Sequence, residues 1–145
     1  MTEIRCWTFG PADGVPEPVA PYSHAAAYGD LLHVTGQLPI DPVTGALVAG
    51  GIAEQTDAVM GHLDRVLRRC GGSLDSVISV RAYLTSFDDY AGFNRAYERW
   101  FATPLPARTC IGVTGLALGA LVEVDLVAAS DGSVVRTGAA PPGAR

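Results

Sequence analysis

The chain has 145 residues, the length of a single domain, and 48% of them are apolar. Charged residues make up only 17%, below the usual value of about 25%, which excludes a disordered chain. A formal net charge of −5 and a pI near 5.0 give no basic footprint for binding nucleic acid or an anionic membrane. The low charged fraction favours a surface that is partly buried against another subunit.

Membrane, targeting and disulfide signals are missing from the sequence. The most apolar stretch, residues 111–122, is too short for a spanning helix, which needs about 20 apolar residues. The N-terminus has no apolar signal core, so we expect a soluble cytoplasmic protein. Cys6, Cys70 and Cys110 are odd in number and widely spaced, which argues against a disulfide framework.

The N-terminal third predicts strands separated by Pro- and Gly-rich segments. Residues 3–9 alternate weakly and suit a short strand, and the proline-rich residues 15–21 predict an extended arm. A weak strand over 22–28 and a better one over 31–35 flank a predicted tight turn. Residues 39–51 then predict a loop.

A helical period of 3.6 runs from Ile52 to Cys70, where two glycines provide an end signal. Residues 74–84 predict a strand. Its alternation places four apolar residues on one face, namely Ile78, Val80, Ala82 and Leu84.

A second helix is predicted over residues 87–101, and we expect its aromatic side to be core rather than a cofactor platform. Two strands follow over 107–113 and 121–129, and the tail over 130–145, rich in Gly, Ala and Pro, is predicted to be mobile. The aromatic side of the helix consists of Tyr90, Phe93, Tyr97, Trp100 and Phe101.

This order of elements predicts one domain over 1–145 with an α+β fold: a two-layer sandwich in which two helices cover one face of a mixed sheet. The other face is mixed in polarity, because Glu123 and Asp125 alternate with the apolar residues of strand 121–129. Such a face is either solvated or buried against a neighbouring subunit, and the low charged fraction favours the subunit.

Three residues on the last two strands, which we expect to be neighbours in the sheet, could carry chemistry. Arg108 and Cys110 share one face of a strand, where an arginine can bind a carboxylate through two hydrogen bonds. The plainer explanations are an arginine paired with a structural acid or with a helix C-terminus, and a cysteine that is a small core residue. Glu123 could act as a general acid or base, or it could be a solvated or salt-bridged structural residue, as is expected for Asp125.

Other positions carry weaker signals. Tyr22 and Thr35 could offer hydroxyl groups to a ligand, and Asn94 lies in a helix where surface asparagines are common. The three histidines show no metal-ligand spacing, so we expect no metal. Nucleotide-binding glycine loops and the serine-hydrolase elbow are also missing.

Several segments, taken together and in this order, resemble the reactive intermediate deaminase family, called RidA, YjgF or L-PSP. The resemblance covers about residues 15–129. The matching pieces are residues 21–23, 32–37, 39–42, 44–45, 50–52, 54–56, 83–85, Asn94, Tyr97, 106–110 and 119–123.

The resemblance implies a chorismate-mutase-like fold and a barrel-like homotrimer with sites in the clefts between subunits. It further implies hydrolysis of reactive enamines and imines, such as 2-aminoacrylate and 2-iminopropionate, to 2-keto acids and ammonia, without a cofactor or metal. Two alternatives are a non-enzymatic trimer that binds a carboxylate metabolite, and an endoribonuclease or translation inhibitor, as attributed to some relatives. The acidic net charge argues against general binding of RNA.

The resemblance also assigns roles to single residues. Arg108 matches the arginine that binds the substrate carboxylate, Glu123 the acid that handles the hydrolytic water, and Cys110 a cysteine beside the ligand. The substrate-binding positions it implies are Tyr22 of the N-terminal arm, Thr35 in place of a more common serine, Gly36 and Asn94. The short segment over 102–106 departs from many relatives and is expected to reshape the rim of the cleft.

Overall fold

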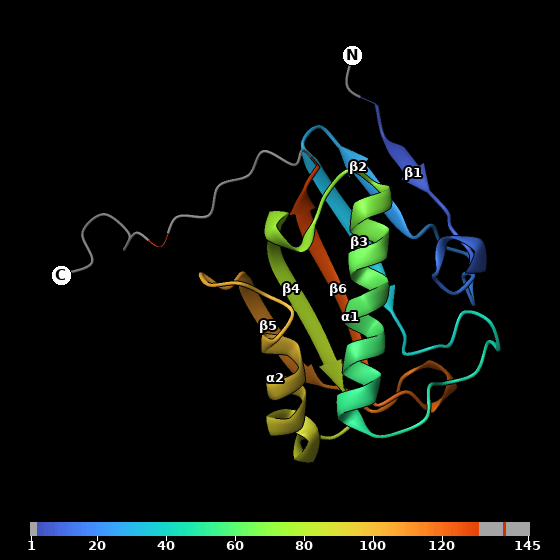
Figure 1. The fold of residues 1–145 in the computed structure, drawn as a ribbon, viewed down its shortest axis with the longest axis vertical. Coiled ribbons are helices and arrows are strands. Elements are labelled where there is room, and N and C mark those ends of the chain that lie inside the picture. The colour runs from blue at the N-terminus through green and yellow to red at the C-terminus, as the bar shows by residue number, and fades with distance from the viewer. Residues whose placement is uncertain (1–2, 131–137, 139–145) are drawn as a thin grey trace.

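Six strands form one mixed sheet in the order β1-β2-β3-β6-β4-β5 (Figure 1). The structure is a computed structural model that describes residues 3–130 and Gly138, so most of the predicted mobile tail lies outside the described residues. Only β4 and β5 pair in parallel; the other pairs are antiparallel. The strands are β1 (Arg5–Trp7), β2 (Ala25–Tyr28), β3 (Leu31–Gln37), β4 (Val77–Leu84), β5 (Ala107–Gly112) and β6 (Val122–Ala129).

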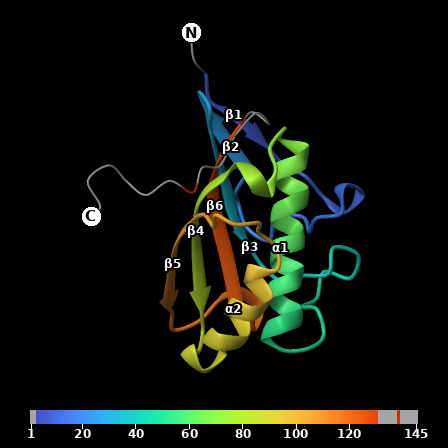
Figure 2. The same cartoon turned by 60° about the vertical axis from the view of Figure 1, so that its left-hand side comes forward.

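Helices α1 (Ile52–Arg69) and α2 (Tyr90–Glu98) both pack on one face of this sheet. In Figure 2 α1 stands to the right of the strands and α2 lies against their lower part, and the opposite face carries no helix from the described residues. The predicted two-layer α+β fold is therefore confirmed. In the part of the chain that the structure describes, no helix is long and apolar enough to cross a bilayer.

The sequence of α1 explains its bounds and its buried side. The Glu54 carboxylate accepts a hydrogen bond from the Gly51 N–H at 2.8 Å, which satisfies a free donor at the helix start. Gly71 follows the helix with φ of +83°, a conformation that glycine adopts without steric cost. The apolar stripe packs on the sheet, and its fully buried members are Val59, Met60, Leu63, Val66 and Leu67.

Strand β6 lies in the middle of the sheet and supplies the core as its alternation predicts. Val122, Val124, Leu126 and Ala128 are at most 2% exposed and face the helices. These four residues pack in one cluster with the α1 stripe and with alternate residues of β4.

One face assignment in β4 is wrong. Val80, Ala82 and Leu84 are buried as predicted, but Ile78 is 48% exposed and Val77 is buried in its place. The pairing of β4 with β6 shifts register between Val77 and Ser79. A one-residue shift moves side chains to the opposite face, which simple alternation cannot anticipate.

Several predicted elements are shorter in the structure. Residues 22–24 precede β2, and Leu74–Ser76 and Phe87–Asp89 are single 3-10 turns. Helix α2 ends at Glu98, so Trp100 lies beyond it, where its Nε1–H donates to Asp57 on α1 at 2.9 Å. This bond fixes the end of α2 against α1.

Two buried histidines hold loops in place. His24 Nδ1 accepts from the Phe9 N–H at 3.1 Å, and its Nε2 donates to the Pro16 carbonyl at 2.9 Å. His62 Nε2 donates to the Ile40 carbonyl at 2.8 Å, so it ties α1 to the loop after β3. Both side chains are satisfied inside the fold.

The stability of the fold should fall on acidification, because burial lowers the pKa of His62 from its ordinary 6.5. As the pH falls, His62 binds a proton in the unfolded chain before it does so in the folded one. Its titration therefore leaves the stability unchanged well above pH 6.5 and destabilises the fold as the pH falls below that value. Chemical denaturation at about 25 °C should show the free energy of unfolding falling between pH 8 and pH 5, and His62→Gln should reduce the slope of this fall. An unchanged slope in the variant would contradict the assignment.

Candidate functional site

Arg108 lies on edge strand β5 and faces the helices. It pairs with Val80 of β4, which is 1% exposed on the helix side. Its guanidinium carbon lies 5.9, 5.4 and 5.0 Å from the ring centroids of Tyr90, Phe93 and Tyr97 on α2. Its Nη2 also donates to the Tyr90 hydroxyl at 3.4 Å. We call these three rings the aromatic cage.

The aromatic cage holds the arginine without neutralising it. Ring faces attract a guanidinium by about 0.5–2 kcal/mol each without adding a negative charge. None of the ion pairs between described residues includes Arg108, so the predicted alternative of a structural acid partner is not found there. The positive charge therefore remains available to an anion.

A cavity of about 250 Å³ opens beside this guanidinium. The short segment before β5 contributes Leu105 and Pro106, so this part of the rim is apolar. Asn94 also lines the cavity, and its Oδ1 is buried without a hydrogen-bond partner among residues 3–130. The other lining residues are Tyr97, Glu98 and Arg108.

Cys110 shares the helix-facing side of β5 with Arg108. It pairs with Ala82 and packs partly buried against the core. Burial raises the pKa of its thiol, and the nearby Arg108 charge offsets this only in part. The thiol is thus neutral at pH 7 and a poor nucleophile.

Glu123 lies on β6 and points to the face without helices. It pairs with Tyr83, whereas its neighbours on β6 face the core. Burial raises the pKa of the Glu123 carboxyl, and the charge of Asp125 raises it further. Asp125 itself is held by Arg81 at 2.8 Å and by the Tyr83 hydroxyl at 2.9 Å, as expected for a salt-bridged structural residue.

Gly36 makes room for the Glu123 side chain. The β3–β6 ladder is irregular between Val34 and Gln37, so Gly36 lies in a bulge opposite β6. A Cβ atom at this position would lie 3.0 Å from Glu123 Cδ and would collide with the carboxylate. The absence of a side chain at residue 36 therefore sets the position of Glu123.

Thr35 precedes Gly36 on β3, and Tyr22 lies in the segment before β2. The Thr35 N–H donates to the His24 carbonyl at 2.9 Å, and Thr35 and Gly36 line a hollow of about 450 Å³ on the open sheet face. Tyr22 precedes β2, and its hydroxyl accepts from the Val19 N–H at 3.2 Å. Thr35, Gly36 and Glu123 form one group, and Arg108, Cys110 and Asn94 form another. The contacts of Tyr22 with Val19 and His24 place it in neither group.

The two groups do not meet within one chain. The sequence interpretation placed Arg108, Cys110 and Glu123 on neighbouring strands, and this is wrong because β4 lies between β5 and β6. Two strand spacings amount to about 10 Å, and the side chains point to opposite faces. The reason is that α2 returns the chain to the outer edge of β4, whereas β6 pairs with its inner edge.

The sequence predicted the aromatic side of α2 but not its contact with Arg108. The spacing of Tyr90, Phe93 and Tyr97 marks one helical side, which was expected to be core only. Phe93 and Tyr97 are indeed buried, but their faces also contact Arg108. No group of three or more His, Cys, Asp or Glu side chains among the described residues could hold a metal ion.

Comparisons with known proteins agree with this fold. The family model described as Endoribonuclease L-PSP matches residues 13–130. A RutC family protein of Sinorhizobium fredii is 42% identical over 77% of this chain and 89% of its own, and one of Pyrococcus abyssi is 39% identical over 78% and 89%. The crystal structure of RidA from an Antarctic Psychrobacter has a TM-score of 0.80 and 30% identity, covering 86% of this chain and 99% of its own.

These matches define the class of protein as a Rid-type α+β domain. The chain belongs to the RidA/YjgF/L-PSP family.

Replacing Gly36 with alanine should displace Glu123 and leave the fold intact, because the new Cβ meets the end of a flexible side chain. With its carboxylate pushed toward water, the raised pKa of Glu123 should fall toward its ordinary 4.5. Carbon-detected NMR titration of labelled glutamate measures this, with Gly115→Ala as the control since that position is open. An unchanged Glu123 titration in a folded Gly36→Ala protein would contradict the packing.

Cys110 should react slowly with iodoacetamide at pH 7.5, because burial raises its pKa. Cys6 is exposed and serves as the internal reference. Peptide mass spectrometry should find Cys6 modified first. Cys110 should react at a measurable rate only at distinctly alkaline pH, because the fraction of thiolate rises about tenfold per pH unit below the pKa. Preferential labelling of Cys110 at pH 7.5 would show an activated thiolate instead.

Proposed function

We propose that this protein hydrolyses enamines and imines of 2-keto acids, of the 2-aminoacrylate and 2-iminopropionate type, to the keto acid and ammonia. One observation carries the proposal: a cationic half-site around Arg108 and an acidic half-site around Glu123 lie on opposite faces of one sheet. Each half is open to a partner. A ring of three subunits would join the Arg108 half of one chain to the Glu123 half of the next.

In this mechanism the substrate carboxylate binds the guanidinium of Arg108 through two hydrogen bonds. The enamine gains a proton at its terminal carbon and becomes the imine. Water adds to the imine carbon while the nitrogen gains the proton that the water loses. The hydroxyl proton then passes to the nitrogen as the carbon–nitrogen bond breaks, which leaves the keto acid and ammonia. Glu123 accepts a proton from the attacking water. Its raised pKa is closer to neutral pH than that of an ordinary glutamate, which makes its carboxylate a stronger base.

Water attacks directly in this proposal. Lysine and arginine together number ten in the chain and all ten are arginine, so the chain offers no lysine amine to form a Schiff base with the substrate. The Cys110 thiol is held neutral by its raised pKa. We therefore assign Cys110 to the wall beside the ligand. Asn94 adds a polar contact to the substrate in the Arg108 half-site. Thr35, Gly36 and Tyr22 contact the substrate in the Glu123 half-site.

The two half-sites give a mixing experiment. Arg108→Ala and Glu123→Gln should each lose nearly all hydrolysis of freshly generated 2-iminopropionate while keeping the assembly that the wild type shows by light scattering. Co-expressed in equal amounts, the two variants should recover about one quarter of wild-type activity, because one site in four then combines an intact Arg108 with an intact Glu123. No recovery would mean that both groups act from the same chain.

Glu123→Gln should separate catalysis from stability. We expect at least a ~100-fold loss of kcat, since the variant cannot accept a proton. The same variant should be more stable at pH 7, because a raised pKa means that ionised Glu123 destabilises the fold above that pKa. The gain should vanish at pH 4, where the wild-type carboxyl is protonated. A variant with full activity would sink the catalytic role.

Two competing functions are separated by the same proteins. A regulatory trimer would bind 2-keto acids at Arg108 without accelerating imine hydrolysis. An endoribonuclease would degrade RNA in a nuclease-free preparation and lose this activity in Arg108→Ala. The acidic net charge of −5 disfavours the second.

A further inference from the structure

Two opposite charges line the cavity beside β5. Arg108 and Glu98 both border its volume of about 250 Å³. Among the described residues, neither takes part in an ion pair within 4.0 Å, and they do not pair with each other. A small cavity with two separated and uncompensated charges complements a ligand with a negative group at one end and a positive group at the other.

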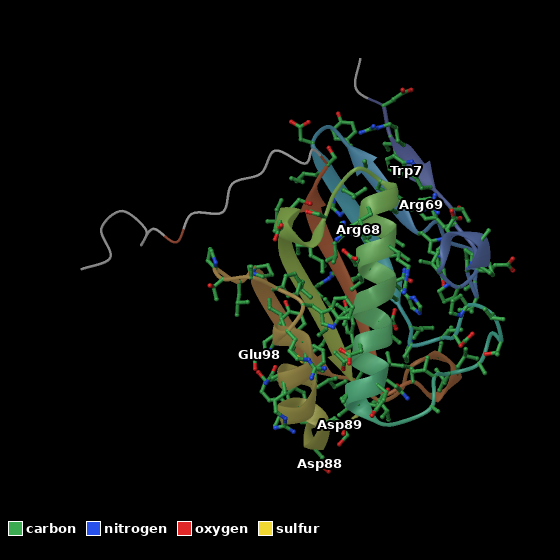
Figure 3. The ribbon with its side chains drawn as sticks, viewed as in Figure 1. Trp7, Arg68, Arg69, Asp88, Asp89 and Glu98 are labelled. Atoms are coloured by element: carbon green, nitrogen blue, oxygen red, sulfur yellow. The ribbon has the colours of Figure 1, made fainter. Side chains whose placement is uncertain are left out.

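Helical spacing sets the direction of this wall. Asn94 and Glu98 both line the cavity and are four residues apart on α2, so they share one side of the helix and lie about 6 Å apart along its axis. Glu98 lies at the end of α2 opposite Asp88 and Asp89 (Figure 3). Its carboxylate is therefore one helical turn beyond Asn94.

The surface between the charges is apolar. Leu105 and Pro106 complete the lining, and Leu105 is 51% exposed. A methylene chain can cover such a surface and leave its charged end free, as lysine and arginine side chains do. The cavity thus presents a cation, an apolar wall and an anion.

We propose that this site prefers 2-imino acids whose side chain ends in a positive charge, with Glu98 as the specificity-determining residue. The inference rests on the proposed function. The substrate carboxylate binds Arg108, its methylene groups contact Leu105, and its terminal cation faces Glu98. The same carboxylate repels substrates with an acidic side chain.

The size of the effect follows from the exposure of Glu98, which lies at the solvent-facing rim of the cavity. A partly solvated charge pair changes affinity modestly, by about 2- to 5-fold. Salt at about 0.5 M screens such a pair and should reduce the preference.

The experiment compares imines that an L-amino-acid oxidase generates from arginine, citrulline and glutamate, with catalase present. Arginine and citrulline have the same length and differ in the charge of the terminal group. Wild type should show a kcat/KM about 2- to 5-fold higher for the arginine-derived imine than for the citrulline-derived one, and the lowest value for the glutamate-derived one. Glu98→Gln should remove the difference between the arginine- and citrulline-derived imines. It should also reduce the disadvantage of the glutamate-derived imine.

Glu3→Gln is the matched control. It removes the same charge near β1, at the sheet edge opposite β5, and should keep the wild-type preference. Equal kcat/KM values in the wild type, or a preference that survives in Glu98→Gln, would overturn the inference.

Failure of the proposed function gives a different result. If the wild type accelerates none of the three imines, hydrolysis is refuted, and calorimetry with the 2-keto acids of arginine and citrulline then decides the inference. Tighter binding of the cationic keto acid that is lost in Glu98→Gln would support it. Equal affinities, or no binding, would overturn it.

Discussion

The position of β4 between β5 and β6 determines what one chain can present to a ligand. It keeps Arg108 and Glu123 two strands apart, and the alternation of side chains sends them to opposite faces. An arginine beside a cavity and a partly buried acid are thus both built into the domain without reaching each other. Under the proposed function, a second copy of the chain supplies the half that each chain lacks.

Arg108 is held in place without a counter-ion among the described residues. Arg108 rests on the faces of Tyr90, Phe93 and Tyr97, which fix the guanidinium without adding negative charge. Asp125, by contrast, is bound to Arg81 and Tyr83 and is structural. Asp125 is therefore paired within the fold, and the proposed function gives a role to the arginine that is not.

The acidic half carries a cost in stability that a binding site alone would not require. Glu123 is held partly buried, next to another acid, in the space that Gly36 leaves open, and both neighbours favour a raised pKa. An ionised carboxylate in such a place destabilises the fold. The proposed role as a proton acceptor gives that arrangement a purpose.

The sequence by itself determined the α+β class, the apolar stripe of α1 and the buried side of β6, because these follow from local periodicity. The family resemblance also named Arg108, Glu123 and Gly36 from their order along the chain. Only the tertiary structure decided which residues meet. The register shift at Val77 depends on pairing with β6, and the contact of Arg108 with α2 joins residues far apart in sequence. Strand order is set by long-range pairing, which no local pattern encodes.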